Sequence, residues 1–332
     1  MNKSYPNIIF ILILSCVFFL LPGSDLKGQE AETPIGPGAR WGHVFIYVPG
    51  HNHILLFGGT NKKGGEFLSD TWIWKQNKWK KIAVSGPSAR GFCAVTFHKG
   101  RNSIILHGGR GNNRETYSDL WEWNGSGWYQ LDKNSDYKAD HHQMVYLKEQ
   151  NTILAFGGWN GEGVTGNTWL WTNKWHKLNI PSPPKRASFS MVYHEKTNDV
   201  VLFGGLWING QYADLWRWSN HKWQALSGPY DHSSLDHHAM IYDKNLDQII
   251  GFGGKNYRYD FQNKTFKIAH DKIHVINNDG PSARHSFGFT FNTKENYGYL
   301  YGGKAFVNGQ QLPLSDFWRW DGQNWNNIPL DR

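Results

Sequence analysis

Leu55-Leu56-Phe57-Gly58-Gly59 is an apolar run that ends in two glycines, and the same arrangement occurs six times along the chain. The other five are Ile105-Leu106-His107-Gly108-Gly109, Leu154-Ala155-Phe156-Gly157-Gly158, Val201-Leu202-Phe203-Gly204-Gly205, Ile250-Gly251-Phe252-Gly253-Gly254 and Tyr299-Leu300-Tyr301-Gly302-Gly303. The first glycines of successive pairs are 50, 49, 47, 49 and 49 residues apart. A repeat of this length with this signature is typical of a β-propeller blade. The sequence therefore predicts an all-β fold of six repeated blades.

Tryptophan marks a second part of each repeat. In five repeats, two tryptophans follow the diglycine at positions i and i+2, as in Asp70-Thr71-Trp72-Ile73-Trp74, and a strand places such residues on one face. A third tryptophan follows shortly. The three slots hold Trp72, Trp74, Trp79, Trp121, Trp123, Trp128, Trp169, Trp171, Trp175, Trp216, Trp218, Trp223, Trp318, Trp320 and Trp325. In repeat 5, we assign Tyr257, Tyr259 and Phe266 to these slots. We expect most of the rings to pack between blades.

From residue 39 to about residue 330, the chain resembles the kelch-repeat family, whose blades include those of the galactose-oxidase central domain. The resemblance implies a six-bladed β-propeller of four-stranded antiparallel blades, at approximately 39–85, 86–135, 136–182, 183–231, 232–279 and 280–332. In the first blade, strand 1 would start near Arg40 and strand 2 would end at Gly58-Gly59. Strand 3 would carry Trp72 and Trp74, and strand 4 would begin at Trp79. We expect the ring to close without a borrowed strand. The alternative is that residues 31–35 pair with the last blade.

The N-terminus has the features of a signal peptide. Residues 8–21 form an apolar run of 14, which is preceded by Lys3 and is short for a membrane span. We therefore predict a signal peptide over 1–28, a propeller over 29–332, and a secreted or periplasmic protein; an uncleaved membrane anchor is the alternative. After cleavage Cys93 is the only cysteine, which excludes an internal disulfide. We expect a monomer without a transmembrane domain.

Charge and missing motifs narrow the function classes. The chain has 35 Lys and Arg against 27 Asp and Glu, and the net charge of +8 is spread along it. Such an excess favours anionic partners, but no basic tract of the kind that binds nucleic acid is present. Phosphate-loop, zinc-protease and nucleophile-elbow motifs are also absent. We expect no cofactor and no metal.

Two sets of positions should face the mouth of the propeller, where the loops between strands 2 and 3 and the loops entering strand 1 emerge. The residues that open strand 1 are Arg40, Arg90, Asp140, Arg186, Asp236 and Arg284, and those after each diglycine are Thr60, Arg110, Trp159, Leu206, Lys255 and Lys304. Guanidinium groups in such a ring could bind carboxylates. Alternatively, each arginine pairs with an aspartate or with carbonyl groups of a neighbouring blade.

Repeats 3 and 5 depart from this pattern, with Asp for Arg and an added histidine pair: Asp140-His141-His142 and Asp236-His237-His238. Imidazole and carboxylate together could perform acid–base catalysis, so the candidate catalytic residues are Asp140, His141, Asp236 and His237. Burial between blades and metal binding are alternatives. The candidate ligand-binding residues are Arg90, Arg110, Trp159, Arg186, Trp207, Lys255, Arg284, His285 and Lys304. Trp159 and Trp207 are included because aromatic residues in polar loops could hold a sugar.

Loop lengths predict an asymmetric face. Tyr257 follows Gly254 by only three residues, so blade 5 should lack its loop between strands 2 and 3 and leave an open-sided cup over blades 3 to 5. We expect this face to bind a partner protein or an anionic or carbohydrate small molecule. The resemblance implies one alternative, a periplasmic sugar-acid enzyme similar to N-acetylneuraminate epimerase (mutarotase). In that enzyme, Arg186 or Arg284 would bind the substrate carboxylate.

Overall fold

The structure, a computed structural model, describes Met1 and residues 36–61, 66–226, 234–276 and 279–330. The chain divides into the units Met1–Thr33 and Pro34–Arg332, and all the strands described belong to the second unit. The expected signal peptide and the alternative clasp at 31–35 lie outside the described residues. Among those described, no helix is long and apolar enough to cross a membrane.

Six four-stranded antiparallel sheets form the blades. Blade 1 contains β1 (Val44–Val48), β2 (His53–Phe57), β3 (Thr71–Lys75) and β4 (Lys78–Ile82). Blade 2 contains β5 (Ala94–His98), β6 (Ser103–His107), β7 (Leu120–Trp123) and β8 (Trp128–Asp132). Blade 3 contains β9 (Gln143–Leu147), β10 (Thr152–Phe156), β11 (Thr168–Trp171) and β12 (Trp175–Leu178).

The remaining blades follow the same order. Blade 4 contains β13 (Ser190–His194), β14 (Asp199–Phe203), β17 (Leu215–Ser219) and β18 (Lys222–Ala225). Blade 5 contains β19 (Ala239–Asp243), β20 (Gln248–Phe252), β21 (Thr265–Ala269) and β22 (Lys272–Ile276). Blade 6 contains β24 (Gly288–Asn292), β25 (Tyr297–Tyr301), β28 (Phe317–Trp320) and β29 (Trp325–Ile328).

The smaller elements lie in the connections. The turns of blades 1 and 2 contain the 3₁₀ helices η1 (Pro49–His51) and η2 (Lys99–Arg101). The connection between the second and third strands, here called the 2–3 loop, carries β15 (Leu206–Trp207) and β16 (Gly210–Gln211) in blade 4. In blade 6 it carries β26 (Lys304–Val307) and β27 (Gln310–Pro313), which pair with β23 (Arg284–His285).

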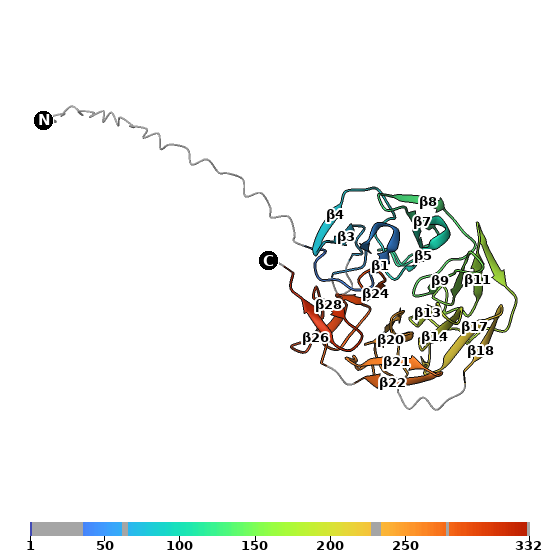
Figure 1. Ribbon diagram of the computed structural model, residues 1–332. Coiled ribbons are helices and arrows are strands. Elements are labelled where there is room, and N and C mark those ends of the chain that lie inside the picture. Colours follow the sequence, from blue (N-terminus) through green and yellow to red (C-terminus); the bar gives the residue numbers. More distant parts are fainter. Residues whose placement is uncertain (2–35, 62–65, 227–233, 277–278, 331–332) are drawn as a thin grey trace. The chain divides into compact units, whose positions relative to one another are not determined.

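The blades surround a common axis. Each first strand contacts the first strand of the next blade, and β24 of blade 6 contacts β1 of blade 1. Figure 1 shows β1, β5, β9, β13 and β24 near the centre of the ring, with β4, β8, β18 and β22 at its periphery. Each blade uses four consecutive major strands, so the described ring closes without a borrowed strand. The fold is a six-bladed β-propeller.

The apolar runs before the diglycines are the most deeply buried strands. All five residues of β2, β6, β10 and β14 are buried, because these strands lie in the middle of their sheets and between neighbouring blades. The fourth strands are largely exposed, apart from a tryptophan near the start in five blades and Ile273 in blade 5. This gradient explains why the apolar runs are continuous instead of alternating.

The repeat tryptophans pack mainly within and between blades. All fifteen are buried or half-buried. Several indole N–H groups cross to the neighbouring blade: Trp128 donates to the Thr71 hydroxyl at 3.0 Å, and Trp325 donates to the Thr265 hydroxyl at 2.8 Å. The structure therefore supports the expectation that these rings join blades together.

The first glycine of each diglycine allows the blades to approach closely. Gly58 has φ +65°, and a Cβ atom there would lie 2.4 Å from the carbonyl oxygen of Arg90 in the next blade. Any side chain would therefore meet both backbone strain and a backbone clash.

A closed belt of backbone hydrogen bonds encircles the axis just before the first strands. Its six members occupy equivalent positions: Gly42, Phe92, His141, Ser188, His237 and Ser286. The N–H of each donates to the carbonyl of the member in the preceding blade, at 2.7–3.0 Å, and Gly42 closes the circle by donating to Ser286. All six have φ between +53° and +65°. We call these residues the axial belt. Because the chain must turn through the belt, β1 starts at Val44 instead of near Arg40.

Candidate functional site

The four arginines that precede strand 1 are buried within ion pairs. Arg40, Arg90, Arg186 and Arg284 are at most 2% exposed, and they pair with Asp70, Asp119, Asp214 and Asp316 of their own blades. Each guanidinium also donates to the carbonyl of the first glycine of the diglycine, at 2.9–3.0 Å. These contacts correspond to the structural alternative, except that the aspartate belongs to the same blade.

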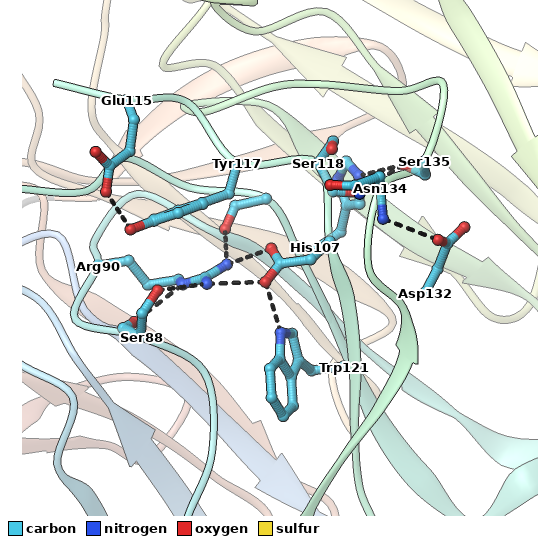
Figure 2. A network of polar contacts seen from close by, with 12 residues as sticks. Ser88, Arg90, His107, Glu115, Tyr117, Ser118, Trp121, Asp132, Asn134 and Ser135 are labelled. Carbon is cyan, nitrogen blue, oxygen red and sulfur yellow. Dashed lines mark hydrogen bonds and ion pairs between the residues drawn. The ribbon is translucent and has the colours of Figure 1, made fainter. Parts of the chain in front are cut away.

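In blade 2, the guanidinium of Arg90 has hydrogen-bond partners at all three of its nitrogen atoms. Arg90 forms a two-pronged pair with Asp119 at 2.5 and 2.9 Å and also donates to the backbone carbonyl and the hydroxyl of Ser88. The ring of Tyr117 lies 3.8 Å from the guanidinium carbon, and Trp121 donates to Asp119 at 2.8 Å. Figure 2 shows Arg90 enclosed between Ser88 and Tyr117. A guanidinium with this many partners is not available to a ligand carboxylate.

Blades 3 and 5 differ from the sequence-based alignment by one residue. In the other blades, the carbonyl of the arginine accepts a hydrogen bond from the second glycine of the preceding blade. Ala139 and Leu235 accept this bond in blades 3 and 5, at 2.9 and 2.8 Å. The arginine is therefore replaced by Ala139 and Leu235, and the assignment of Asp140 and Asp236 to that position is wrong. Asp140 and Asp236 lie one residue further along, at the position of His285 in blade 6.

The carboxylate partner disappears from the same two blades. Asn167 and Lys264 stand where Asp70 stands in blade 1, directly before the third strand. Retaining the carboxylate without its arginine would leave an uncompensated, partly buried charge, so both partners change together. In blade 3, the hydroxyl of Tyr137 donates to the carbonyl of Gly157 at 3.0 Å and replaces the guanidinium there.

The 2–3 loop of blade 5 is also different from the prediction. Phe266 lies in β21, at the position that Trp72 occupies in β3, and it follows Gly254 by 12 residues, against 13 between Gly59 and Trp72. Blade 5 therefore has a 2–3 loop of ordinary length, and the predicted gap in the rim is wrong. The misalignment arose because this blade lacks both tryptophans that mark strand 3.

The two aspartates of blades 3 and 5 each hold the first histidine of the adjacent pair. Asp140 is fully buried, lies 2.5 Å from Nδ1 of His141, and accepts bonds from Arg110 and Thr116 at 2.9–3.2 Å. Burial opposes ionisation of Asp140, but the bond from His141 and the charges of His141 and Arg110 bring its pKa below the usual value. Asp140 is thus ready to accept the Nδ1–H of His141.

The arrangement in blade 5 is similar. Asp236 is fully buried, contacts Nδ1 of His237 and the side-chain amide of Gln211, and lies 3.3 Å from Nζ of Lys255. Burial opposes its ionisation, yet His237 and Lys255 lower the pKa of Asp236 to about 2. Burial lowers the pKa of His237 to about 4, against the opposing effect of Asp236. At neutral pH the pair is therefore a carboxylate beside a neutral imidazole.

The second histidine of each pair belongs to the core. His142 and His238 are buried, and burial holds the pKa of each well below the usual value, at about 3 for His238. Nε2 of His142 lies 2.8 Å from Nδ1 of His107, and the ring of His238 packs against Phe203. For these two histidines, the structure agrees with burial between blades. In the described ranges, no group of three His, Cys, Asp or Glu side chains is placed to hold a metal ion.

The other predicted site residues form an outer ring around the belt. The residues after five of the diglycines form antiparallel β-bridges with the residue before a belt member, so their backbones extend the inner sheet edges. They are Arg110, Trp159, Leu206, Lys255 and Lys304. Trp159 is half-buried, and Trp207, also half-buried, lies in β15 with its ring 6.4 Å from that of Tyr212. Lys304 lies over Trp41 at 4.8 Å.

Three histidines of the candidate set meet near the axis. The ring centroids of His141 and His237 are 5.5 Å apart, as are those of His237 and His285, and Phe92 stacks on His141 at 3.9 Å. An axial cavity of about 640 Å³ extends from the belt along the first strands of all six blades. Phe92, His141, Ser188 and His237 line it. The structure thus gathers His141 and His237 at one polar site, whereas Arg90, Arg186 and Arg284 lie in ion pairs outside it.

Exposed apolar side chains form a second surface feature, on the 2–3 loops of blades 4 to 6. They are Ile208, Tyr257, Tyr259, Phe306, Val307 and Leu312. Sequence reasoning missed these residues in blades 4 and 6 and placed Tyr257 and Tyr259 in a strand. It also missed Ser188, which a count of 16 residues back from the first glycine of each repeat would have placed with His141 and His237.

Comparison with known proteins agrees with this architecture. Residues 26–205, more than half of the chain, match the family model described as the KLHDC2/KLHL20/DRC7 Kelch-repeats domain. No curated protein matches the chain. The structure shows the same blade architecture beyond residue 205, where the sheets of blades 5 and 6 complete the ring. The chain therefore belongs to the kelch-repeat family, whose propellers generally serve as protein-interaction modules.

Proposed function

We propose that the protein is a secreted or periplasmic interaction module that binds a partner protein through the 2–3 loops of blades 4 to 6. The observation that carries this proposal is the cluster of exposed apolar side chains on three consecutive loops. Tyr259 is 69% exposed and Phe306 is 54% exposed, whereas the strand phenylalanines that precede the diglycines, Phe57, Phe156, Phe203 and Phe252, are at most 1% exposed. Several exposed apolar and aromatic side chains on neighbouring loops are typical of a binding site.

The charges on these loops indicate the chemistry of the partner. Besides Lys255, which pairs with the buried Asp236, residues 255–264 and 304–313 contain three cationic side chains and one acidic side chain, Asp260. Arg258 lies over the ring of Tyr257 at 5.3 Å, so that one aromatic surface and one cation are presented together. A complementary partner would offer an apolar segment flanked by carboxylates.

The predicted substrate-binding residues do not favour the sugar-acid enzyme. Arg186 and Arg284 are fully buried and paired with Asp214 and Asp316, so they do not offer a binding group to a substrate carboxylate. The half-buried Trp159 and Trp207 likewise do not form an open sugar platform.

A photo-crosslinking amino acid placed at Phe306 tests the proposed surface in the source cells. The same amino acid at Tyr129, which is also 54% exposed but lies on the outer strand β8, is the matched control. We expect a discrete crosslinked partner from position 306 that is lost in a Tyr259→Ser background. Crosslinking from position 129 but not from position 306 would refute the placement.

The export part of the proposal rests on the apolar run 8–21. We expect the mature chain to start between Ser24 and Glu30. N-terminal sequencing that finds Met1 retained in a membrane fraction would contradict it.

A further inference from the structure

We infer that Ser188, His237 and Asp236 form an activated serine nucleophile at the axial belt, able to accept the acyl group of a carboxylic ester. The hydroxyl oxygen of Ser188 lies 3.1 Å from Nε2 of His237, and Nδ1 of the same ring contacts a carboxylate oxygen of Asp236. The serine comes from blade 4 and the other two residues come from blade 5. This inference does not depend on partner binding by the 2–3 loops.

The hydrogen bonds select the tautomer that such a nucleophile needs. A carboxylate can only accept, so the contact with Asp236 requires the proton of the neutral ring to be on Nδ1. Nε2 is then left with its lone pair directed at the Ser188 hydroxyl, which donates to it. Gln211 donates to the other carboxylate oxygen of Asp236, and Lys255 lies 3.3 Å from the oxygen that His237 contacts. A serine, a base and a group that orients the base are the three parts of an activated hydroxyl nucleophile.

The other belt members provide an internal comparison. Asp140 and His141 form the same carboxylate–imidazole pair in blade 3, but the belt residue of the preceding blade is Phe92, which has no hydroxyl. Ser286 has a hydroxyl 2.9 Å from Nδ1 of His285, and no carboxylate contact to that imidazole is found in the described residues. Of the two belt serines, Ser188 is therefore the one whose hydroxyl meets an imidazole backed by a carboxylate.

The position of Ser188 also suits a nucleophile. Ser188 and His237 both line the axial cavity, so a small ligand in the cavity reaches the pair. Ser188 has φ +56°, a strained conformation for a residue with a side chain. The other five belt members share this conformation, so the belt fixes the backbone of Ser188 and directs its side chain, and the strain does not by itself distinguish Ser188.

The reaction balances with water as the only co-reactant. The Ser188 oxygen forms a bond to the carbonyl carbon of the ester while its proton moves to Nε2 of His237. The ester C–O bond breaks, and the proton passes from His237 to the departing alkoxide. Water then attacks the carbonyl carbon of the acyl-serine while its proton moves to Nε2 of His237. The bond to the Ser188 oxygen breaks, and that oxygen takes the proton from His237. The products are an acid and an alcohol. Ser188 and His237 touch the reacting atoms, whereas Asp236 is a positioning residue.

A fluorophosphonate probe tests the nucleophile on the purified protein, because an activated serine displaces fluoride from phosphorus. We expect one covalent adduct by intact mass, mapped to Ser188. Ser188→Gly should abolish it; glycine accepts the belt conformation, as Gly42 shows at φ +65°. Ser286→Gly is the matched control and should keep the wild-type labelling rate. His237→Gln should slow labelling by about 100-fold or more, the usual contribution of a general base.

A pH–rate profile separates the role of Asp236 from simple support of the fold. The anion of Asp236 and the cationic Lys255 both face His237, together with His141 and His285. Labelling should require neutral His237, and Asp236→Asn should shift the midpoint of the profile to lower pH. An unlabelled wild-type protein, an adduct that persists in Ser188→Gly, or equal rates for wild type and a folded His237→Gln variant would each overturn the inference.

Discussion

The buried Arg90–Asp119 pair allows a quantitative test of how the arginine ring acts in this protein. Arg90 is 2% exposed and the Asp119 side chain is 10% exposed, so neither charge can be hydrated if the other is removed. Arg90→Leu would remove five hydrogen bonds to Asp119, Gly108 and Ser88 and leave the carboxylate with only the indole N–H of Trp121.

We expect Arg90→Leu to lower the free energy of unfolding by about 3–5 kcal/mol, the usual cost of breaking a buried ion pair from one side. With an unfolding entropy of about 2.1 cal/mol/K per residue over roughly 300 residues, this corresponds to a drop of about 5–8 °C in Tm. Arg101→Leu is the control in the same blade. Arg101 pairs with Glu122 at 2.8 Å but its side chain is 42% exposed, so the loss should be about 1 kcal/mol or less.

The decisive measurement is a double-mutant cycle with Arg90→Leu, Asp119→Asn and the combined variant, followed by calorimetry. Blades 3 and 5 naturally lack both partners, so the double variant should recover about 1–3 kcal/mol relative to the sum of the single changes. If the single losses add to within about 0.5 kcal/mol, the two residues are not coupled and the structural explanation of their joint absence fails.

Two further predictions concern the diglycine turns and acid stability. Gly58→Val should lower the free energy of unfolding by several kcal/mol, because its Cβ would lie 2.4 Å from a backbone carbonyl oxygen. The control, Gly309→Val, has φ +75° and no atom within 4 Å of the added Cβ, so it should cost only the backbone strain of about 1–2 kcal/mol. Equal losses in thermal unfolding would count against the turn geometry. Burial lowers the pKa of His43 and His238 to about 3 and that of His142 well below its usual value, so all three favour the folded state above the unfolded pKa of about 6.5 and destabilise it as the pH falls below that value. Urea titrations should show a loss of up to about 1.4 kcal/mol per pH unit for each such histidine, and unchanged stability between pH 7 and 5 would contradict their burial as neutral groups.

The repeat markers predict the register correctly in the blades that carry them and not in the blades that lack them. In blade 1, the Arg40, Gly58 and Trp72 markers all occur, and the predicted order of the strands matches the structure apart from the start of β1. Blade 5 has neither the arginine nor the tryptophans, so Phe266 was assigned to the wrong strand. The same loss of markers moved Asp140 and Asp236 by one position. The backbone hydrogen bonds show the correct register, between neighbouring blades for Asp140 and Asp236 and within the sheet of blade 5 for Phe266.

The sequence by itself determined the number of blades, the buried second strands and the packing role of the tryptophans, because each depends on local patterning that repeats every 47–50 residues. It also identified Asp140, His141, Asp236 and His237 as unusual. Only the tertiary structure decided what these residues contact. Ser188 and His237 are 49 residues apart in sequence and come together because closure of the ring forces one residue of every blade into the axial belt. A site assembled by closure depends on contacts between blades, so a count along each repeat finds the equivalent positions but does not show which of their side chains touch.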